Sequence, residues 1–196
     1  MKQFSVFAGL AVLAGCKKNR SHTSAEGVVI DATTQARVAG ARVYLLKTTG
    51  TSLYAFPSRV QHVNADALGK FSLSFEADEN SQYDLQATAP TFFDTPSNEY
   101  VGLFKGDKNK KNVTVRPEAW LRIRFVSAVP SVLTAVSLQT PSAIATDISG
   151  RDIDTTIISR CNGNVNTELT WWIGNNRNNS TIYCPAHDTT DYAIRF

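Results

Sequence analysis

Residues 121–125 read Leu-Arg-Ile-Arg-Phe, and this alternation of apolar and charged side chains decides the fold class. The same period of two occurs in residues 71–75, Phe-Ser-Leu-Ser-Phe, and in residues 192–196, Tyr-Ala-Ile-Arg-Phe. Successive side chains of a β-strand point to opposite faces of its sheet. Each stretch therefore predicts a strand with one buried and one solvated face.

Clusters of turn-forming residues separate these stretches, among them residues 31–35, 67–70, 149–152 and 174–179. After residue 16, no apolar pattern with a 3.6-residue period reaches the length of a helix. Many short strands at spacings of roughly ten residues are typical of β-sandwiches and barrels. We therefore predict an all-β protein with two small β-sandwich domains in tandem.

The composition is that of a globular protein. The chain has 196 residues, of which 42% are hydrophobic and 19% charged, and its formal net charge is +3. At roughly 100 to 200 residues per domain, this length fits one ordinary domain or two small ones. The charge is too small to predict a nucleic-acid partner, and three scattered histidines do not indicate a histidine-rich metal site.

The first 16 residues have the layout of an export signal. Lys2 gives a positive start, and residues 4–14 form an apolar run that is shorter than the ~20 residues a membrane-spanning helix requires. We therefore interpret residues 1–15 as a secretory signal that is removed from the mature protein. Residues 13–16, Leu-Ala-Gly-Cys, resemble the lipobox of bacterial lipoproteins. The resemblance implies that Cys16 is acylated and anchors the mature chain in a membrane.

Residues 16–22 are assigned to the lipidated cysteine and its tether. Lipoproteins kept at the inner membrane of enteric bacteria have Asp directly after the cysteine, so Lys17 favours the outer membrane. Surface-exported lipoproteins of Bacteroidota resemble one another in having acidic residues at this place, whereas residues 17–22 are basic. The expected location is therefore the periplasmic face of the outer membrane, and the cell surface is the alternative.

Four short motifs follow in order in the first half of the mature chain. They are Glu-Gly-Val-Val-Ile-Asp at 26–31, Val-Ala-Gly-Ala-Arg-Val-Tyr-Leu at 38–45, Asp-Ala-Leu-Gly-Lys-Phe at 66–71 and Tyr-Asp-Leu-Gln-Ala at 83–87. Together they resemble the carboxypeptidase regulatory-like domain, a small transthyretin-like β-sandwich. Ala65 departs from the usual Thr of that pattern. The resemblance implies an accessory module without catalytic residues, to which we assign residues 23–117.

A domain boundary is predicted at Pro117, because proline has no N–H to donate to a sheet and the strand at 112–116 should end there. Residues 118–196 would then form the second sandwich. Cys161 and Cys184 are the cysteines that remain after Cys16 is lipidated. In an exported chain an even pair predicts a disulfide, and a loop of this length gives roughly 3 to 4 kcal/mol of stabilisation.

Motifs for catalysis are missing from the sequence. It contains no Gly-x-Ser-x-Gly, His-Glu-x-x-His or Cys-x-x-Cys motif. We predict a protein that is not an enzyme and has no catalytic residue, cofactor or metal site, with an enzyme whose site is scattered in the sequence as the open alternative. Asp147, Asp152 and Asp154 could offer oxygen ligands to Ca²⁺, but they lack the EF-hand spacing and are interpreted as turn residues. The lysines at 105, 108, 110 and 111 are interpreted as a solvated hairpin tip.

An exposed aromatic patch is the candidate ligand site. Alternation places Trp171 in the core and Trp172 on the outer face, and beyond the expected turn at 174–179 it places Tyr183 on an outer face as well. We expect Trp172 and Tyr183 to meet beside Asn176 and Arg177. Flat rings beside amide groups suit a sugar or an extended peptide. The alternative is that the rings pack across strands or under the first domain.

The expected function is that of a non-catalytic, lipid-anchored envelope protein, a binding or assembly accessory to an outer-membrane complex. Its expected partners are the membrane, through Cys16, and an envelope protein. The alternative is a carbohydrate-binding lipoprotein of a glycan-uptake system that uses Trp172 and Tyr183. Residues 154–156 and 188–190, both Asp-Thr-Thr, resemble the O-glycosylation acceptor of Bacteroidota, and such use requires Thr155 and Thr189 to be exposed.

Overall fold

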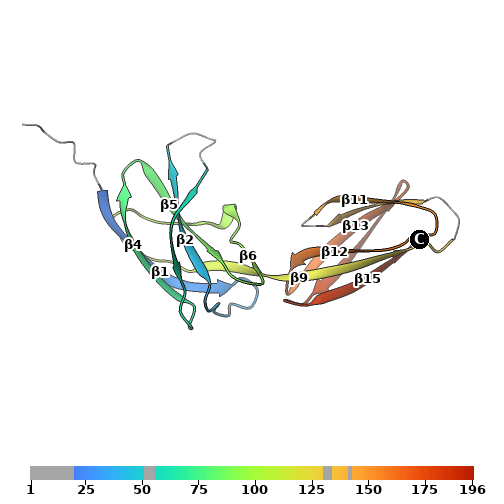
Figure 1. Cartoon of the computed structure of the whole chain (residues 1–196), viewed down its shortest axis with the longest axis horizontal. Helices are drawn as coiled ribbons and strands as arrows, with labels where there is room; N and C mark the ends of the chain where they lie inside the picture. The colour runs from blue at the N-terminus through green and yellow to red at the C-terminus, as the bar shows by residue number, and fades with distance from the viewer. Residues whose placement is uncertain (1–19, 51–55, 130–133, 141–142) are drawn as a thin grey trace, which may run out of the picture.

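A computed structural model describes residues 20–50, 56–129, 134–140 and 143–196 (Figure 1). The expected signal peptide, Cys16 and residues 17–19 lie outside the described residues. The protein is all-β, as predicted: apart from the short 3-10 helix η1 (Ser97–Glu99), the described regular elements are strands. In the part of the chain that is described, no helix is long and apolar enough to cross a membrane.

The first sandwich consists of two facing sheets. One sheet is centred on β1 (Arg20–Asp31), which pairs with β4 (Lys70–Asp78), with the short strand β8 (Lys108–Lys110) and with the start of β9 (Val113–Val126). The other sheet has the order β3 (Ser58–Asn64), β2 (Arg42–Thr49), β5 (Ser81–Thr88), β7 (Val101–Gly102). β1 begins at Arg20, so residues 20–22, which we expected in the tether, belong to the sheet.

The second sandwich uses the later half of β9. This part of β9 lies between β12 (Asp154–Asn162) and β15 (Thr189–Arg195). The facing sheet has the order β11 (Ala143–Gly150), β10 (Thr134–Thr140), β13 (Val165–Ile173), β14 (Asn176–Cys184).

The buried side chains form two clusters, one inside each sandwich. The first cluster includes Phe71, Leu73 and Leu85, and the second includes Leu121, Ile123 and Phe125. The alternation of the sequence is confirmed along β9, where these last three side chains are 0% exposed while Arg122 and Arg124 between them are exposed. The outward face of β9 therefore carries polar side chains.

The prediction that a strand ends at Pro117 is wrong, because β9 continues through this residue into the second sandwich. β9 changes its partners here. On one side, β1 pairs with Val113 to Val115 and β12 pairs with β9 from Glu118 onward; on the other side, the short strand β6 (Phe92–Phe93) pairs with Arg116 and Pro117. The carbonyl of Pro117 still accepts a hydrogen bond from the Gly163 N–H at 2.7 Å. The missing proline N–H thus falls where one partner strand gives way to another, and the strand tolerates it.

Side-chain contacts join the two sandwiches at this point. The Asn164 amide donates to Thr33 Oγ1 at 3.2 Å, and the rings of Phe92 and His187 meet edge to face with centroids 5.1 Å apart. The Arg160 guanidinium lies over the ring of Phe93 at 4.5 Å. Figure 1 shows the two sandwiches end to end, with the start of β1 at one extremity of the long axis and the C-terminus at the other.

Candidate functional site

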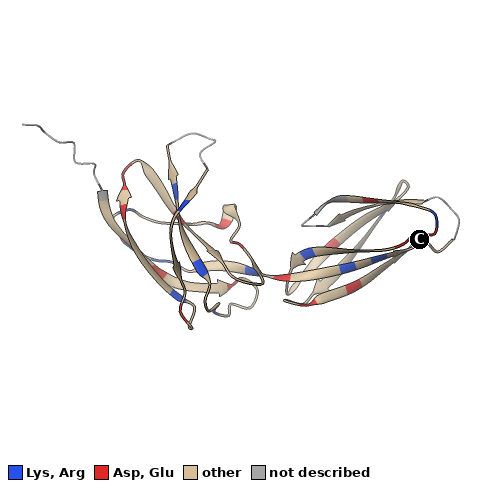
Figure 2. Ribbon diagram, viewed as in Figure 1, with Lys and Arg blue, Asp and Glu red and all other residues tan. Residues whose placement is uncertain are grey.

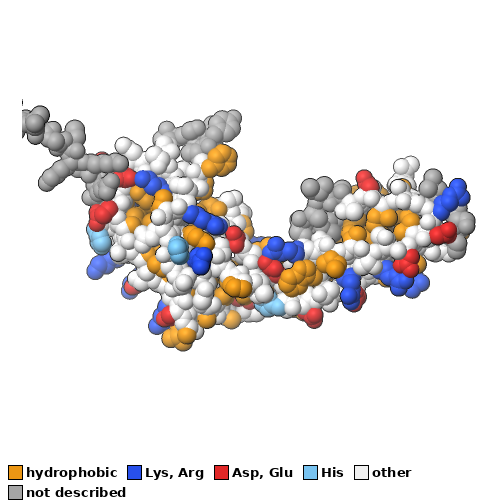
Figure 3. Space-filling view, viewed as in Figure 1, with side chains coloured by type: hydrophobic (Ala, Val, Ile, Leu, Met, Phe, Trp, Pro, Cys, Tyr) orange, Lys and Arg blue, Asp and Glu red, His pale blue; other side chains and the backbone are white. Residues whose placement is uncertain are grey.

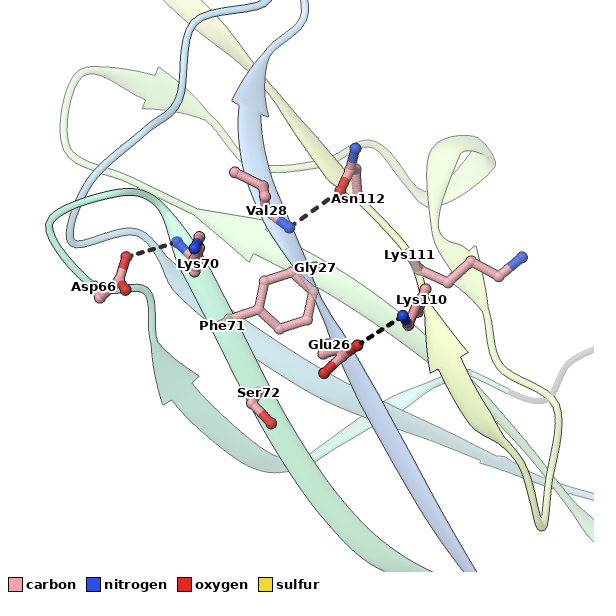
Figure 4. Close-up of a pocket in the computed structure, with 10 residues that line it drawn as sticks. All are labelled: Glu26, Gly27, Val28, Asp66, Lys70, Phe71, Ser72, Lys110, Lys111 and Asn112. Carbon is pink, nitrogen blue, oxygen red and sulfur yellow. Dashed lines mark hydrogen bonds and ion pairs between the residues drawn. The ribbon is translucent and has the colours of Figure 1, made fainter.

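A groove of about 730 Å³ opens on the first sandwich beside β1 (Figure 4). Side chains from β1, from the start of β4 and from the segment between β8 and β9 surround it. These lining residues are Glu26, Gly27, Val28, Asp66, Lys70, Phe71, Ser72, Lys110, Lys111 and Asn112. The groove combines the aromatic ring of Phe71 with several charged groups.

The groove lies where β1 changes partner from β8 to β9. The Lys111 N–H donates to the Glu26 carbonyl at 2.9 Å, and the Val28 N–H donates to Asn112 Oδ1 at 3.1 Å. The backbone of Lys111 comes so close to β1 that a Cβ on Gly27 would lie 1.7 Å from the Lys111 carbonyl oxygen. Glycine is therefore required at residue 27 for this close approach.

The charges around the groove are only partly compensated. Asp66 Oδ1 accepts the backbone N–H groups of Leu68 and Lys70, each at 2.8 Å, and Lys110 lies 3.7 Å from Glu26 in an exposed ion pair. Lys70 and Lys111 have no ion-pair partner among the described residues. The Lys70 ammonium thus remains available to an anionic ligand at the groove, whereas the Lys111 side chain points away from it (Figure 4) and lies 5.5 Å from the centre of the Phe104 ring.

The lysine-rich segment beside the groove is solvated, as expected, since Lys105, Lys108 and Lys110 are exposed, but it is not a hairpin tip. Residues 108–110 form β8, which runs parallel to β1. Asn109, which is 4% exposed, holds the segment: its amide donates to the carbonyls of Ser24 and Phe104, and its Oδ1 accepts the Phe104 N–H at 2.8 Å. The buried Asn109 side chain ties the segment to β1, and for this reason the segment does not form a hairpin tip. Phe104, next to it, is 67% exposed.

Trp172 and Tyr183 do not form one patch. The turn between β13 and β14 consists of Gly174 and Asn175 alone, so Trp172 lies opposite Arg177 while Tyr183 lies opposite Asn166. The two rings share an outer face but are six residue pairs apart, about 20 Å along the strands. The shorter turn sets this register, and the expectation of a joint patch is wrong.

Trp172 has other neighbours, which we call the Trp172 face: Arg177, Ser137 and Asp147. The Arg177 guanidinium carbon lies 5.9 Å from the centre of the Trp172 ring. Ser137 lies opposite Trp172 on β10, and its hydroxyl donates to Asp147 at 2.5 Å. Sequence reasoning missed these two residues as neighbours, because the pairing of β10 with β13 carries no local signal. Asn176 lies opposite Ile173, a position whose side chain belongs to the other face.

The outer face of β12, β9 and β15 carries ion pairs (Figure 2). Arg122 is paired with Asp191 and Arg124 with Asp154 through two hydrogen bonds each. The hydrogen bonds from these arginines hold the pKa of each aspartate below its ordinary value. Of the aspartates considered as Ca²⁺ ligands, Asp154 is thus paired with Arg124, whereas Asp147 accepts a hydrogen bond from Ser137. No group of three potential metal ligands is found among the described residues.

Basic and acidic side chains are interspersed on both sandwiches over the face that Figure 3 shows. Ile158, opposite Arg122 on β12, is a large apolar side chain that is 66% exposed. Thr155 and Thr189 of the two Asp-Thr-Thr triplets are exposed. Their modification stays a prediction.

Cys161 and Cys184 lie in the core of the second sandwich, on different sheets. Both are buried, at 4% and 0% exposure, and the structure describes both as free thiols. Burial, together with a hydrogen bond to Cys184, raises the pKa of the Cys161 thiol to about 12. The two sulfurs are therefore neighbours, and the predicted disulfide, which would join the two sheets, stays a prediction.

No protein-family model and no curated protein matches the chain. Among solved structures it is similar to GBS52, the minor pilin of Streptococcus agalactiae, with 10% identity over 88% of this chain and 94% of that one and a TM-score of 0.41. It is also similar to a DUF3823 family protein from Bacteroides ovatus, with 10% identity, coverage of 86% and 99%, and a TM-score of 0.31. The Bacillus anthracis TIE protein matches 89% of the chain at 11% identity with a TM-score of 0.39, and the chain spans 34% of its length. Similarity at this level assigns no activity.

Proposed function

We propose that the protein is a non-catalytic lipoprotein of the outer membrane, anchored through Cys16, that acts as a binding or assembly accessory to an envelope complex. The observation that carries the proposal is the continuity of β9 through both sandwiches. A single strand of this length reaches about 45 Å. Such a strand suits a spacer that holds its second sandwich at a set distance from its anchor.

The position of the expected anchor supports this arrangement. Cys16 precedes Arg20, the first residue of β1, by four residues, and these span at most ~14 Å when fully extended. The start of β1 lies at one extremity of the molecule, while the Trp172 face lies near the far end of β13. With an acylated Cys16, the second sandwich would stand away from the membrane.

Each of the three histidines lies against a carboxylate or an aromatic ring. Nδ1 of His22 lies 3.0 Å from Glu76 on an exposed surface, the ring of His62 lies against Tyr44, and the ring of His187 lies against Phe92. In the described residues, none of these contacts joins a histidine to a serine or threonine hydroxyl or to a cysteine thiol. A general base aimed at a nucleophile requires such a contact.

Crosslinking in cells followed by mass spectrometry tests the proposal, with Cys16→Ala as the unanchored control. We expect one envelope protein to be recovered with the anchored form and to be lost with Cys16→Ala. Recovery of the same proteins with both forms, at the level of an unrelated lipoprotein, would contradict an accessory role that depends on the anchor.

A second candidate function, carbohydrate binding, is favoured by the Trp172 face. Trp172 is half-buried with one ring face next to Arg177, and the adjacent Ser137 and Asp147 present a hydroxyl and a carboxylate. Rings flanked by such groups bind sugars by stacking and hydrogen bonding. The Trp172 ring, without Tyr183, would be the platform.

Titration calorimetry with envelope glycans tests this candidate. Trp172→Ala should abolish the binding heat, whereas Tyr183→Ala should leave it unchanged, because Tyr183 lies at the other end of the hairpin. Equal effects of both variants, or no binding heat with the unmodified chain, would rule out a sugar site at Trp172.

A further inference from the structure

Lysines are confined to one part of this molecule. All nine lie at or before residue 111, and the second sandwich carries arginine as its basic residue. Residues 17–117 hold 13 Lys and Arg against 10 Asp and Glu, whereas residues 118–196 hold 6 against 7. The positive charge of the mature chain is therefore concentrated in the sandwich that follows Cys16.

Four of these lysines and one aromatic residue lie on the groove-lining strands and on the segment that leads into them; Lys70, Lys110 and Lys111 line the groove itself. We call the whole set the lysine face: Lys70, Lys108, Lys110, Lys111 and Phe104. Lys70 and Lys110 to Lys111 line opposite sides of the groove (Figure 4), and the Lys111 ammonium lies 5.5 Å from the centre of the Phe104 ring. Lys70, Lys108 and Lys111 have no ion-pair partner among the described residues.

Acidic groups near the lysine face are Glu26, Asp66 and Asp107. Glu26 is paired with Lys110, and Asp66 Oδ1 is turned toward two backbone N–H groups. The sequence adds Lys17, Lys18 and Arg20 directly before and at the start of β1. The four lysines of the lysine face thus stand beside three carboxylates, and Arg20 at the start of β1 lies opposite Asp78 of β4.

The lysine-bearing segment lies close to the point where the tether enters the fold. The Ser24 N–H donates to the Asp107 carbonyl at 3.1 Å, and the Gly106 N–H donates to Thr23 Oγ1 at 2.9 Å. These contacts hold the segment beside the first residues of β1. A membrane that holds an acylated Cys16 would thus be within reach of these lysines.

We infer that the lysine face rests on anionic phospholipid headgroups and sets the orientation of the first sandwich on the membrane. This inference builds on the proposed anchor at Cys16. Lysine binds phosphate as a point charge without fixed geometry, which suits mobile headgroups. Phe104 is 67% exposed and its backbone N–H is held by Asn109, so it offers an apolar ring to the membrane interface.

Vesicle flotation tests the inference with the chain that begins at residue 16 and carries Cys16→Ala. Without acyl chains, the variant reports on the lysine face alone. We expect it to float with vesicles of phosphatidylcholine and phosphatidylglycerol at ~0.05 M salt, and to be released at ~0.5 M salt, where charges are strongly screened. Phosphatidylcholine vesicles should not retain it.

Matched charge variants locate the contact. The triple variant Lys70→Gln, Lys108→Gln, Lys111→Gln should lower vesicle partitioning by about two orders of magnitude, at about fivefold per lysine. The control triple Arg42→Gln, Arg151→Gln, Arg195→Gln removes the same charge from exposed positions elsewhere and should stay within about threefold of the unmodified chain. Equal losses in both triples, or no flotation with anionic vesicles, would overturn the inference.

Competition with a soluble phosphate distinguishes binding to lipid headgroups from binding to a free phosphate. Millimolar glycerol phosphate should not displace the protein from vesicles, because a single headgroup engages few of the lysines. Binding of glycerol phosphate in the absence of vesicle binding would assign the groove to a soluble anion and overturn the membrane contact. Because no variant in this series is acylated, failure here is distinct from failure of the anchor at Cys16.

Discussion

Gly27 is the position at which β1 approaches the backbone of Lys111 beside the candidate groove. A methyl group on this residue would meet the Lys111 carbonyl oxygen at 1.7 Å, so Gly27→Ala must push β1 and the Lys111 backbone apart. We expect a loss of about 3 kcal/mol or more in the free energy of unfolding, measured by urea denaturation. Gly102→Ala is the matched control, because its methyl would meet Asp84 at an ordinary 3.7 Å and should cost less than about 0.5 kcal/mol. Equal effects of the two substitutions would contradict the close approach.

Asp31, near the junction of the two sandwiches, makes stability depend on pH. Burial by itself raises its pKa, but hydrogen bonds from Thr33 and Thr34 outweigh burial and hold the pKa below its ordinary value of 3.8. A carboxyl with a lowered pKa in the folded state stabilises the fold above its unfolded-state pKa, and this stabilisation is lost as the pH falls through the folded-state value. Asp31→Asn should therefore lower the free energy of unfolding by about 1 to 2 kcal/mol at pH 7.

The pH profile distinguishes this effect from simple damage. Between pH 5 and pH 3, the difference between the unmodified chain and Asp31→Asn should shrink, because the unmodified chain alone loses the contribution of the carboxylate. Thr33→Ala removes one of the donors and should show a smaller part of the same dependence. A constant difference across this range would show that Asp31 does not titrate below its ordinary pKa.

At the residue scale, alternation in the sequence predicts which side chains are buried, as the positions of Leu121, Ile123 and Phe125 show. It does not predict why Gly27 must be glycine. The atom that excludes a side chain belongs to Lys111, which is distant in the sequence and reaches Gly27 only through the pairing of β1 with β8 and β9. A single sequence contains no signal for such a contact.

At the scale of strands, the neighbouring sulfurs of Cys161 and Cys184 lead to a prediction about the mature protein. We expect protein isolated from the cell envelope to contain a disulfide and to be lighter than the reduced chain by the mass of two hydrogen atoms. Reduction should lower the free energy of unfolding by roughly 3 kcal/mol. Cys16→Ala should retain this disulfide, and an unchanged mass after reduction of the native protein would contradict it.

The reduced protein should also protect its thiols. Burial raises the pKa of Cys161 to about 12, so the native reduced chain contains almost no thiolate at this residue at pH 8. Iodoacetamide should therefore leave Cys161 unmodified in the folded protein and alkylate it in urea. Rapid alkylation of Cys161 in the folded, reduced protein would show that the site is accessible.

The hairpin of β13 and β14 shows where sequence reasoning succeeds and fails at this scale. The inward set of Leu169, Trp171 and Ile182 is predicted by alternation and is confirmed. The register is not predicted, because residues 174–179 all favour turns while the structure uses two of them. Each residue removed from the turn changes which side chains face each other, and Trp172 and Tyr183 were separated in this way.

At the scale of the whole molecule, β9 should keep the two sandwiches in one relative orientation. Spin labels at the exposed positions 60 and 181 should give a single narrow distance distribution. Insertion of two glycines after Pro117 interrupts β9 and should broaden this distribution while both sandwiches stay folded. A broad distribution in the unmodified chain would contradict a rigid junction.

Local signals could not predict this arrangement. Pro117 favours a strand end when it is considered alone, and the strands that support β9 on its two sides, β6 and β12, come from segments far apart in the sequence. Two sandwiches in tandem could be predicted from the sequence, because chain length and the alternation of apolar residues indicate them. The strand that both sandwiches share could not be predicted, because it depends on pairing between segments far apart in the sequence.

The intact mass of the protein extracted from membranes tests the central claim most directly. We predict a chain that begins at Cys16, is heavier than its amino-acid sequence by the mass of its acyl groups, and partitions into detergent. Cys16→Ala should lose both the added mass and the membrane association. A water-soluble chain without added mass, or one that begins at another residue, would contradict the account of a lipid-anchored envelope protein.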